Sequence, residues 1–156
     1  FRVAPKINGA GKVEGKVTRQ GYLALAGNNL TYPAIAVNTD GKGVIAFTAM
    51  GDDLFPSAAY ATIDASGAAA PPPLPAEGLG PDDGFTSYKA FVGDPPRTRW
   101  GDYGAAVTDG SSIWMASEYI AQTCTLSQYL TAPIGSCGGT RTSLGNWSTR
   151  LTKITP

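Results

Sequence analysis

The sequence predicts an all-β protein made of short antiparallel strands. Its 156 residues include 20 glycines and 12 prolines, and only 15% of the residues are charged. This composition favours short strands joined by tight turns over long helices. Two segments of similar plan, each with two apolar runs around an Asp-Gly turn, indicate the same class. A chain of this length is expected to form one domain over residues 1–156.

The first of these segments, YPAIAVNTDGKGVIAFTAM (residues 32–50), is typical of a β-hairpin. Asp40-Gly41 lies between its apolar runs, and glycine adopts the positive φ that such a turn requires. A strand with two apolar faces must be covered on both sides, so we expect sheets stacked against other sheets. The second run has such faces, with Val44, Ala46 and Met50 on one and Ile45, Phe47 and Ala49 on the other.

The second segment, RTRWGDYGAAVTDGSSIWMASEY (residues 97–119), repeats this plan with Asp109-Gly110 at the turn. In both segments the first strand is rich in small residues: Ala34 and Ala36 in one, and Gly104 to Ala106 in the other. Small side chains are what crowding near a shared central axis would require. We therefore expect the first strand of each hairpin to lie innermost.

Three more strands are predicted at residues 21–26, 58–63 and 149–154, the last as an outer strand. The repeat units then span about 21–65 and 99–156. Residues 66–98 between them are rich in proline, which lacks the backbone donor of a sheet, and are expected to form a crossover.

Repeated antiparallel units, apolar on both faces and small along the inner strand, are typical of the blades of a β-propeller. A blade takes about 40 to 50 residues and a closed propeller has at least about four blades, so this chain would hold about three. We expect the rest of the propeller to come from a second chain or from residues outside this sequence. The alternative architecture is a compact β-sandwich that covers itself.

The composition also narrows the chemistry. The absence of histidine excludes Ser-His-Asp and Cys-His nucleophilic sites and His-ligated zinc within this chain. The net charge is zero, with scattered basic residues, which argues against a nucleic-acid partner. No apolar run approaches the roughly 20 residues of a membrane span.

The two cysteines, Cys124 and Cys137, lie in the turn-rich stretch CTLSQYLTAPIGSC. We expect a disulfide between them, which would contribute about 3 kcal/mol by constraining the unfolded chain. A disulfide implies an oxidising compartment and hence a secreted protein. The alternative is two unrelated buried thiols.

Six charged and aromatic residues form the candidate site. Four precede the inner strand of the second hairpin and two end the strand that follows, so they are expected to meet at one rim of the sheets, where propellers place ligand sites. One hypothesis is a pocket for a carbohydrate or another polar ligand. The alternative is a lock between blades, with an Arg-Asp ion pair and a tryptophan wedge. The residues are Arg99, Trp100, Asp102, Tyr103, Glu118 and Tyr119.

Two acidic pairs, Asp52-Asp53 and Asp82-Asp83, flank glycines in loops. Their oxygens are of the kind that Ca²⁺ binds, although neither pair has the spacing of a calcium loop. Calcium is therefore a weak expectation, and the sequence predicts no other cofactor.

Several stretches resemble the C-terminal region of secreted bacterial proteins with sialidase-like, Asp-box type β-propellers. They are YPAIAVNTDGKGVIAFT, FPSAAYATID, DDGFTSY, RWGDYGAAV, IWMASEY and the terminal NWSTRLTKI. The resemblance implies a secreted propeller. Both Asp-Gly turns depart from the Ser-x-Asp-x-Gly-x-Thr-Trp pattern of an Asp box, and Phe1-Arg2-Val3-Ala4-Pro5 has one residue more than the Phe-Arg-Ile-Pro signature of sialidases. No motif supplies the remaining arginines, the Tyr-Glu pair or the acid/base of such an enzyme.

Three functions follow as hypotheses. The first is a non-catalytic extracellular recognition or scaffold module, with a glycan as its candidate ligand. The second is a sialidase-like glycoside hydrolase whose active site is completed by absent blades, and three arginines converging beside a Tyr-Glu pair would favour it. The third is a structural subunit of an extracellular assembly, in which exposed sheet edges pair between chains.

Overall fold

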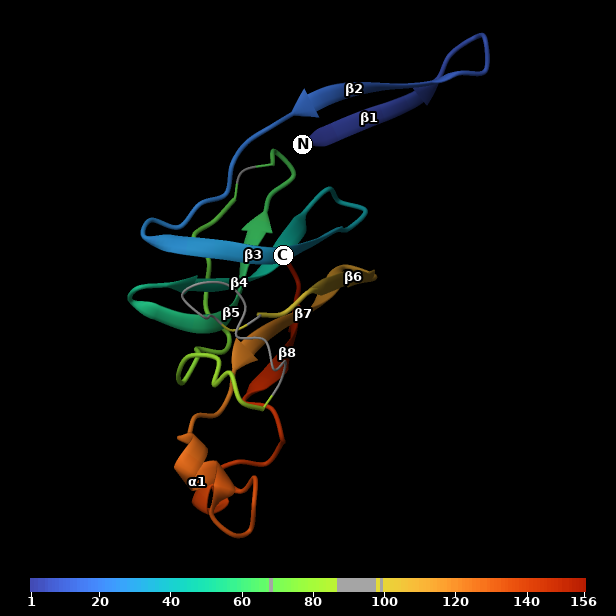
Figure 1. The fold of residues 1–156 in the computed structure, drawn as a ribbon. Helices are drawn as coiled ribbons and strands as arrows, with labels where there is room; N and C mark the ends of the chain where they lie inside the picture. Colours follow the sequence, from blue (N-terminus) through green and yellow to red (C-terminus); the bar gives the residue numbers. More distant parts are fainter. Residues whose placement is uncertain (68, 87–97, 99) are drawn as a thin grey trace.

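The computed structural model describes residues 1–67, 69–86, 98 and 100–156, and in them it confirms the all-β class. The strands form three antiparallel sheets (Figure 1). One is a hairpin of β1 (Arg2–Ile7) and β2 (Val13–Arg19). The other two sheets have three strands each. The one we call the first sheet has β3 (Asn28–Val37), β4 (Gly43–Gly51) and β5 (Leu54–Ile63). The second sheet has β6 (Ala105–Asp109), β7 (Ser112–Ile120) and β8 (Trp147–Ile154).

Both predicted hairpins are confirmed, as β3–β4 and β6–β7. In the first, the Asn38 side-chain oxygen accepts hydrogen bonds from the backbone N–H groups of Asp40 (3.0 Å) and Lys42 (3.1 Å). Gly41 has a φ of 76°, a conformation that side-chain-bearing residues rarely adopt. The Asn-x-x-Gly-Lys pattern therefore specifies this turn through its asparagine and its glycine.

The β1–β2 hairpin has the same turn, although the sequence analysis missed it. Asn8 accepts hydrogen bonds from the N–H groups of Ala10 (2.9 Å) and Lys12 (3.0 Å), and Gly11 has a φ of 75°. Asn8 to Lys12 repeats the Asn-x-x-Gly-Lys pattern and was the available signal. The even spacing of Val3 and Ile7 in β1 and of Val13 and Val17 in β2 was a second available signal.

The first and second sheets stack face to face, with β3 beside β6 and β4 over β7. The layer between them is built from Ala36, Val44 and Ala46 of the first sheet and Ile113 and Met115 of the second. Small residues permit this approach. A side chain at Gly104, just before β6, would place its Cβ 2.8 Å from the carbonyl oxygen of Tyr32.

The other face of the first sheet is covered in part by loop segments. Phe47 and Ala49 of β4 are buried there, with Leu23, Leu25 and Leu74 packed against the cluster. Strand β4 is thus buried on both faces, as its two apolar faces predict. The prediction of a strand over residues 21–26 is wrong, because only Leu25 forms a bridge, to Asn28. Its leucines pack onto the sheet face instead of pairing along an edge.

The predicted strands at 58–63 and 149–154 are present and longer, as β5 and β8. No strand forms within residues 69–86, where only isolated bridges occur, from Ala69 to Ile63 and from Ala76 to Ala58. The rest of the proline-rich crossover, at residues 68, 87–97 and 99, lies outside the described residues.

Residues 121–146, which we call the lobe, lie at the end of the molecule opposite the β1–β2 hairpin (Figure 1). The lobe contains the short helix α1 (Leu126–Leu130), capped by Thr125 and Gln128, and a 3₁₀ turn at Cys137–Gly139. The predicted disulfide between Cys124 and Cys137 is confirmed, with a Cα–Cα distance of 6.0 Å. It closes the lobe covalently in a region with few buried residues.

Candidate functional site

The structure brings three of the six predicted site residues together. Trp100 and Asp102 lie in the segment that enters β6, and Glu118 lies on β7. The Tyr32 hydroxyl of β3 donates a 2.6 Å hydrogen bond to the carbonyl oxygen of Trp100. Gly101 has a φ of 40°, and a Cβ on it would collide with the Glu118 carboxylate and touch the Tyr32 ring. This glycine therefore allows the segment to lie directly against Glu118.

The Glu118 carboxyl is half-buried in this cluster. Burial raises its pKa above the usual 4.5, and repulsion from the Asp102 carboxylate raises it further. The indole N–H of Trp100 is buried and has no acceptor among the described residues. The cluster thus holds a carboxyl group that ionises less readily than an exposed one.

Replacing Glu118 by glutamine is expected to stabilise the protein at neutral pH. The pKa is raised in the folded state, so stability falls as the pH rises from the unfolded-state pKa through the folded-state pKa. Glutamine carries no charge, so its advantage should shrink as the pH falls and disappear once the carboxyl is protonated in both states. Urea unfolding at several pH values measures this difference.

The matched control is Glu14→Gln in the exposed β1–β2 hairpin. There, hydrogen bonds from Asn8 and Lys6 lower the carboxyl pKa, so the variant should gain no stability at neutral pH. An advantage of Glu118→Gln that is constant with pH would contradict the role assigned to its ionisation.

Of the other predicted site residues, the two tyrosines, Tyr103 and Tyr119, do not join the cluster. Tyr103 is 83% exposed. Tyr119 follows Glu118 directly in β7, and successive side chains of a strand point to opposite faces, so the two cannot meet on one side. Arg99 lies outside the described residues. The sequence analysis placed Glu118 and Tyr119, two successive residues of one strand, at the same rim and did not allow for this alternation.

The cluster joins the two sheets at one end of the stack. Tyr32 belongs to β3 and contacts the segment entering β6, while the Thr48 hydroxyl of β4 donates a 2.8 Å hydrogen bond to the Glu118 carbonyl of β7. Both contacts run from the first sheet to the second. Chemically, this arrangement fits a polar lock between sheets better than a catalytic pair.

A second polar cluster, which the sequence did not reveal, anchors the lobe. Arg141 donates a 2.9 Å hydrogen bond to Asp83, and the two side chains are only 1% and 4% exposed. The same guanidinium donates to the carbonyl oxygens of Ser143 and Leu144 and lies 5.1 Å from the Tyr129 ring centre. Arg141 is the only charged residue of the lobe, and that isolation was the available signal.

Of the acidic pairs considered for calcium, Asp83 has both carboxylate oxygens engaged by protein groups. They accept from Arg141, from the Thr86 hydroxyl and from the backbone N–H groups of Phe85 and Thr86. Asp82 accepts from the Gly84 N–H. Asp52 and Asp53 lie exposed in the β4–β5 turn. Across the described residues, no three His, Cys, Asp or Glu side chains gather as a metal site.

The outer face of the second sheet is a candidate interaction surface. The paired residues Val107 and Trp114 of β6 and β7 lie side by side there, with Leu151 of β8 on the same face. Their exposed fractions are 60%, 42% and 65%. Lys153 lies over the Trp114 ring and also pairs with Asp109 at 3.3 Å. This face therefore presents an apolar stripe with one polar end.

The four described arginines do not gather at one point, and one of them, Arg150, is exposed on β8 of the second sheet. Arg2 and Arg19 lie at the base of the β1–β2 hairpin, and Arg141 is buried in the lobe at the other end of the molecule. In the part of the chain that the structure describes, no helix is long and apolar enough to cross a membrane.

Comparison of the chain with protein-family models, curated proteins and solved structures finds no match.

Proposed function

We propose that this chain is a non-catalytic extracellular scaffold or recognition module, in which the two stacked sheets are neighbours in a propeller-type array. Further sheets, from a second chain or from residues outside this sequence, cover the outer faces. The disulfide supports an oxidising compartment and hence a secreted protein.

The exposed stripe of Val107, Trp114 and Leu151 is the observation that carries this proposal. A sheet that faces water normally alternates apolar residues inside with polar residues outside. Here the inner positions, such as Ile113 and Met115, are buried, yet three outer positions, those of the stripe, also carry large apolar side chains. A contiguous apolar patch of this kind marks an interaction surface.

The outer face of the first sheet supports the same proposal. Ile35 and Val37 of β3 are exposed there, although Phe47 on the same side is buried. The outer faces of both sheets thus present apolar side chains that are only partly covered. A self-contained sandwich would present polar residues on both outer faces, so the propeller-type array accounts for these faces better than the sandwich does.

The described arginines are dispersed, and Glu118 lies in the polar lock between the two sheets. Both observations support a non-catalytic role. A sialidase-like site needs several arginines around one substrate carboxylate. For a glycan ligand, we propose stacking on the exposed aromatic ring of Tyr103.

A triple variant, Val107→Thr, Trp114→Thr and Leu151→Thr, tests the proposal. Threonine keeps a high strand propensity while removing most of the apolar surface. We expect the isolated chain to bind the dye ANS and to self-associate in light scattering. The variant should bind less dye and associate less, with the apolar outer face of the first sheet left in place, while keeping its β-sheet circular dichroism.

The matched control is Leu126→Thr, Leu130→Thr and Ile134→Thr, which removes exposed apolar residues from the lobe. This control should leave self-association unchanged. If the sheet variant binds ANS and associates as strongly as the original chain, its outer face is not an interaction surface.

A further inference from the structure

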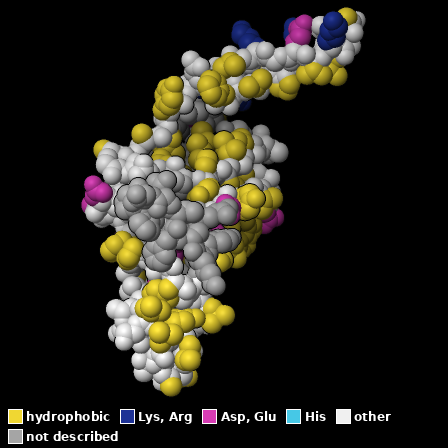
Figure 2. Space-filling model, viewed as in Figure 1, with side chains coloured by type: hydrophobic (Ala, Val, Ile, Leu, Met, Phe, Trp, Pro, Cys, Tyr) yellow, Lys and Arg dark blue, Asp and Glu magenta, His cyan; other side chains and the backbone are white. Residues whose placement is uncertain are grey.

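The lobe exposes large apolar side chains to water. Leu126, Leu130, Ile134 and Leu144 are each at least half exposed. Leu126 and Leu130 lie four residues apart in α1 and therefore share one face of the helix. Figure 2 shows hydrophobic side chains over this end of the molecule. An exposed apolar patch of this kind marks a site of contact with a protein or a membrane.

Internal contacts fix the segments that carry these side chains. The Gly135 N–H donates a 2.8 Å hydrogen bond to the Tyr129 carbonyl oxygen of α1. A Cβ at Gly135 would lie 3.7 Å from the Tyr129 ring and from a methyl carbon of Leu144. The turn that holds Ile134 thus packs against both α1 and Leu144, and the disulfide closes the same region. The lobe therefore presents its apolar side chains without having to fold on contact.

The surface of the lobe carries no charge. Its only charged residue is Arg141, which is buried and paired with Asp83. Figure 2 accordingly shows no charged side chain on the lobe in that view. Removing a charged group from water costs free energy, whereas removing an apolar group from water is favourable. The lobe can therefore leave water without dehydrating an exposed charge.

Several polar groups of the lobe are hydrogen-bonded within it. The Thr131 hydroxyl donates to a carbonyl oxygen of α1 at 2.9 Å, and the Thr140 hydroxyl donates to the Cys137 carbonyl oxygen at 2.8 Å. Thr125 and Gln128 cap the first turn of α1 reciprocally. Backbone groups that approach the hydrocarbon of a bilayer need such internal partners, because water is scarce there.

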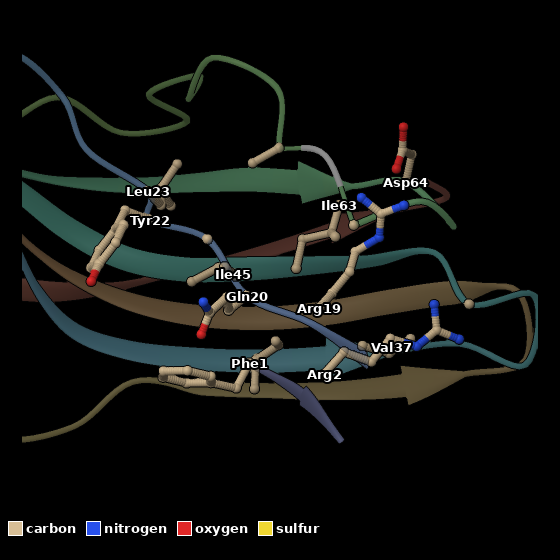
Figure 3. A pocket seen from close by; sticks show the side chains of 15 residues that line it. Phe1, Arg2, Arg19, Gln20, Tyr22, Leu23, Val37, Ile45, Ile63 and Asp64 are labelled. Atoms are coloured by element: carbon tan, nitrogen blue, oxygen red, sulfur yellow. The ribbon is translucent and has the colours of Figure 1, made fainter. Parts of the chain in front are cut away.

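The opposite end of the molecule has a different character. The β1–β2 hairpin carries the exposed Lys6–Glu14 ion pair. A groove of about 500 Å³ at its base is lined by Arg2, Arg19 and Asp64 together with apolar residues (Figure 3). A molecule with this distribution can place its lobe in an apolar phase while the charged end stays in water.

The residue types of the patch favour a lipid surface over a protein partner. Protein interfaces are enriched in aromatic residues, methionine and arginine, and leucine is under-represented among the residues that dominate their binding energy. The large exposed apolar residues of the lobe are all leucine or isoleucine, which enter a bilayer readily. Trp147, which directly follows the lobe, is exposed, and tryptophan is typical of the level of the lipid head groups.

We infer that the lobe inserts its apolar side chains into the interfacial layer of a phospholipid bilayer, as a peripheral contact. Zwitterionic phospholipids are the class that fits, because the lobe offers no exposed charge to an anionic head group. The inference does not depend on the proposed function, since the lobe and the outer faces of the sheets are different surfaces.

Flotation with phosphatidylcholine vesicles tests the inference. We expect the chain to float with the vesicles equally at low and high salt, because no ion pair with the lipid is involved. The lobe variant Leu126→Thr, Leu130→Thr and Ile134→Thr should partition into the vesicles about tenfold less or weaker still, because it loses most of the exposed apolar area of the lobe. The three side chains are exposed, so its melting curve should be unchanged.

The sheet variant Val107→Thr, Trp114→Thr and Leu151→Thr is the matched control and should float as the original chain does. In a separate variant, Ile134→Trp, vesicles with brominated acyl chains should quench the added tryptophan. Any of three results would overturn the inference: no flotation of the original chain, flotation only with anionic lipid at low salt, or equal flotation of the lobe variant. Loss of flotation in the sheet variant alone would instead place the lipid contact on the second sheet.

Discussion

Replacing Arg141 by alanine should lower the free energy of unfolding of the lobe by about 3–5 kcal/mol. The change leaves the Asp83 carboxylate buried without its cation, and it also removes the donors to the Ser143 and Leu144 carbonyl oxygens. Urea unfolding, together with hydrogen exchange over residues 121–146, measures the loss. We expect the lobe amides to lose protection before those of β4 and β7.

Lys153→Ala is the matched control, because it breaks the exposed Lys153–Asp109 pair, whose side chains are 45% and 63% exposed. Water screens such a pair, and its loss should cost no more than about 1 kcal/mol. The double variant Arg141→Met and Asp83→Asn removes both charges and should recover part of the stability. A loss below about 1 kcal/mol for Arg141→Ala would show that the buried pair does not anchor the lobe.

Phe47→Ala is expected to destabilise the whole stack by about 3–5 kcal/mol. Phe47 is fully buried at the centre of the first sheet, where Ala49 and Ala59 are too small to fill the space that its ring leaves. Thermal unfolding followed by circular dichroism measures the effect.

Phe55→Ala removes the same side chain from an exposed position in β5 and serves as the control. Its cost should stay within about 0.5 kcal/mol, as for surface substitutions in general. Equal losses for the two variants would mean that the cluster around Phe47 is not the core of the first sheet.

The fold class and the two main hairpins were predictable from the sequence because local chemistry determines them. In the β3–β4 turn, the Asn38 side chain and the Gly41 φ act within five residues, and the β6–β7 turn has Gly110 with a φ of 61°. The apolar residues on both faces of β4 correctly predicted its burial on two sides. The cysteine spacing likewise predicted the disulfide.

Contacts between distant segments were not predictable in the same way. Leu23 and Leu25 alternate as in a strand, but they pack onto the face of the first sheet, and nothing local distinguishes these outcomes. The Arg141–Asp83 pair joins residues far apart in the chain, so the sequence isolates Arg141 as the only charged residue of the lobe but does not indicate its partner. At the candidate site, Glu118 lies against the segment entering β6, whereas Tyr119 points to the other face of β7, a difference that the sequence analysis did not consider.

The central claim is that a further sheet covers the apolar outer face of the second sheet. Carbene footprinting with mass spectrometry tests it most directly, by comparing residues 1–156 alone with the protein isolated from its native source. We expect Val107, Trp114 and Leu151 to be labelled strongly in the isolated chain and much less in the native protein, with Leu126 and Ile134 of the lobe labelled equally in both. Equal labelling of the three outer-face residues in both samples would contradict the claim.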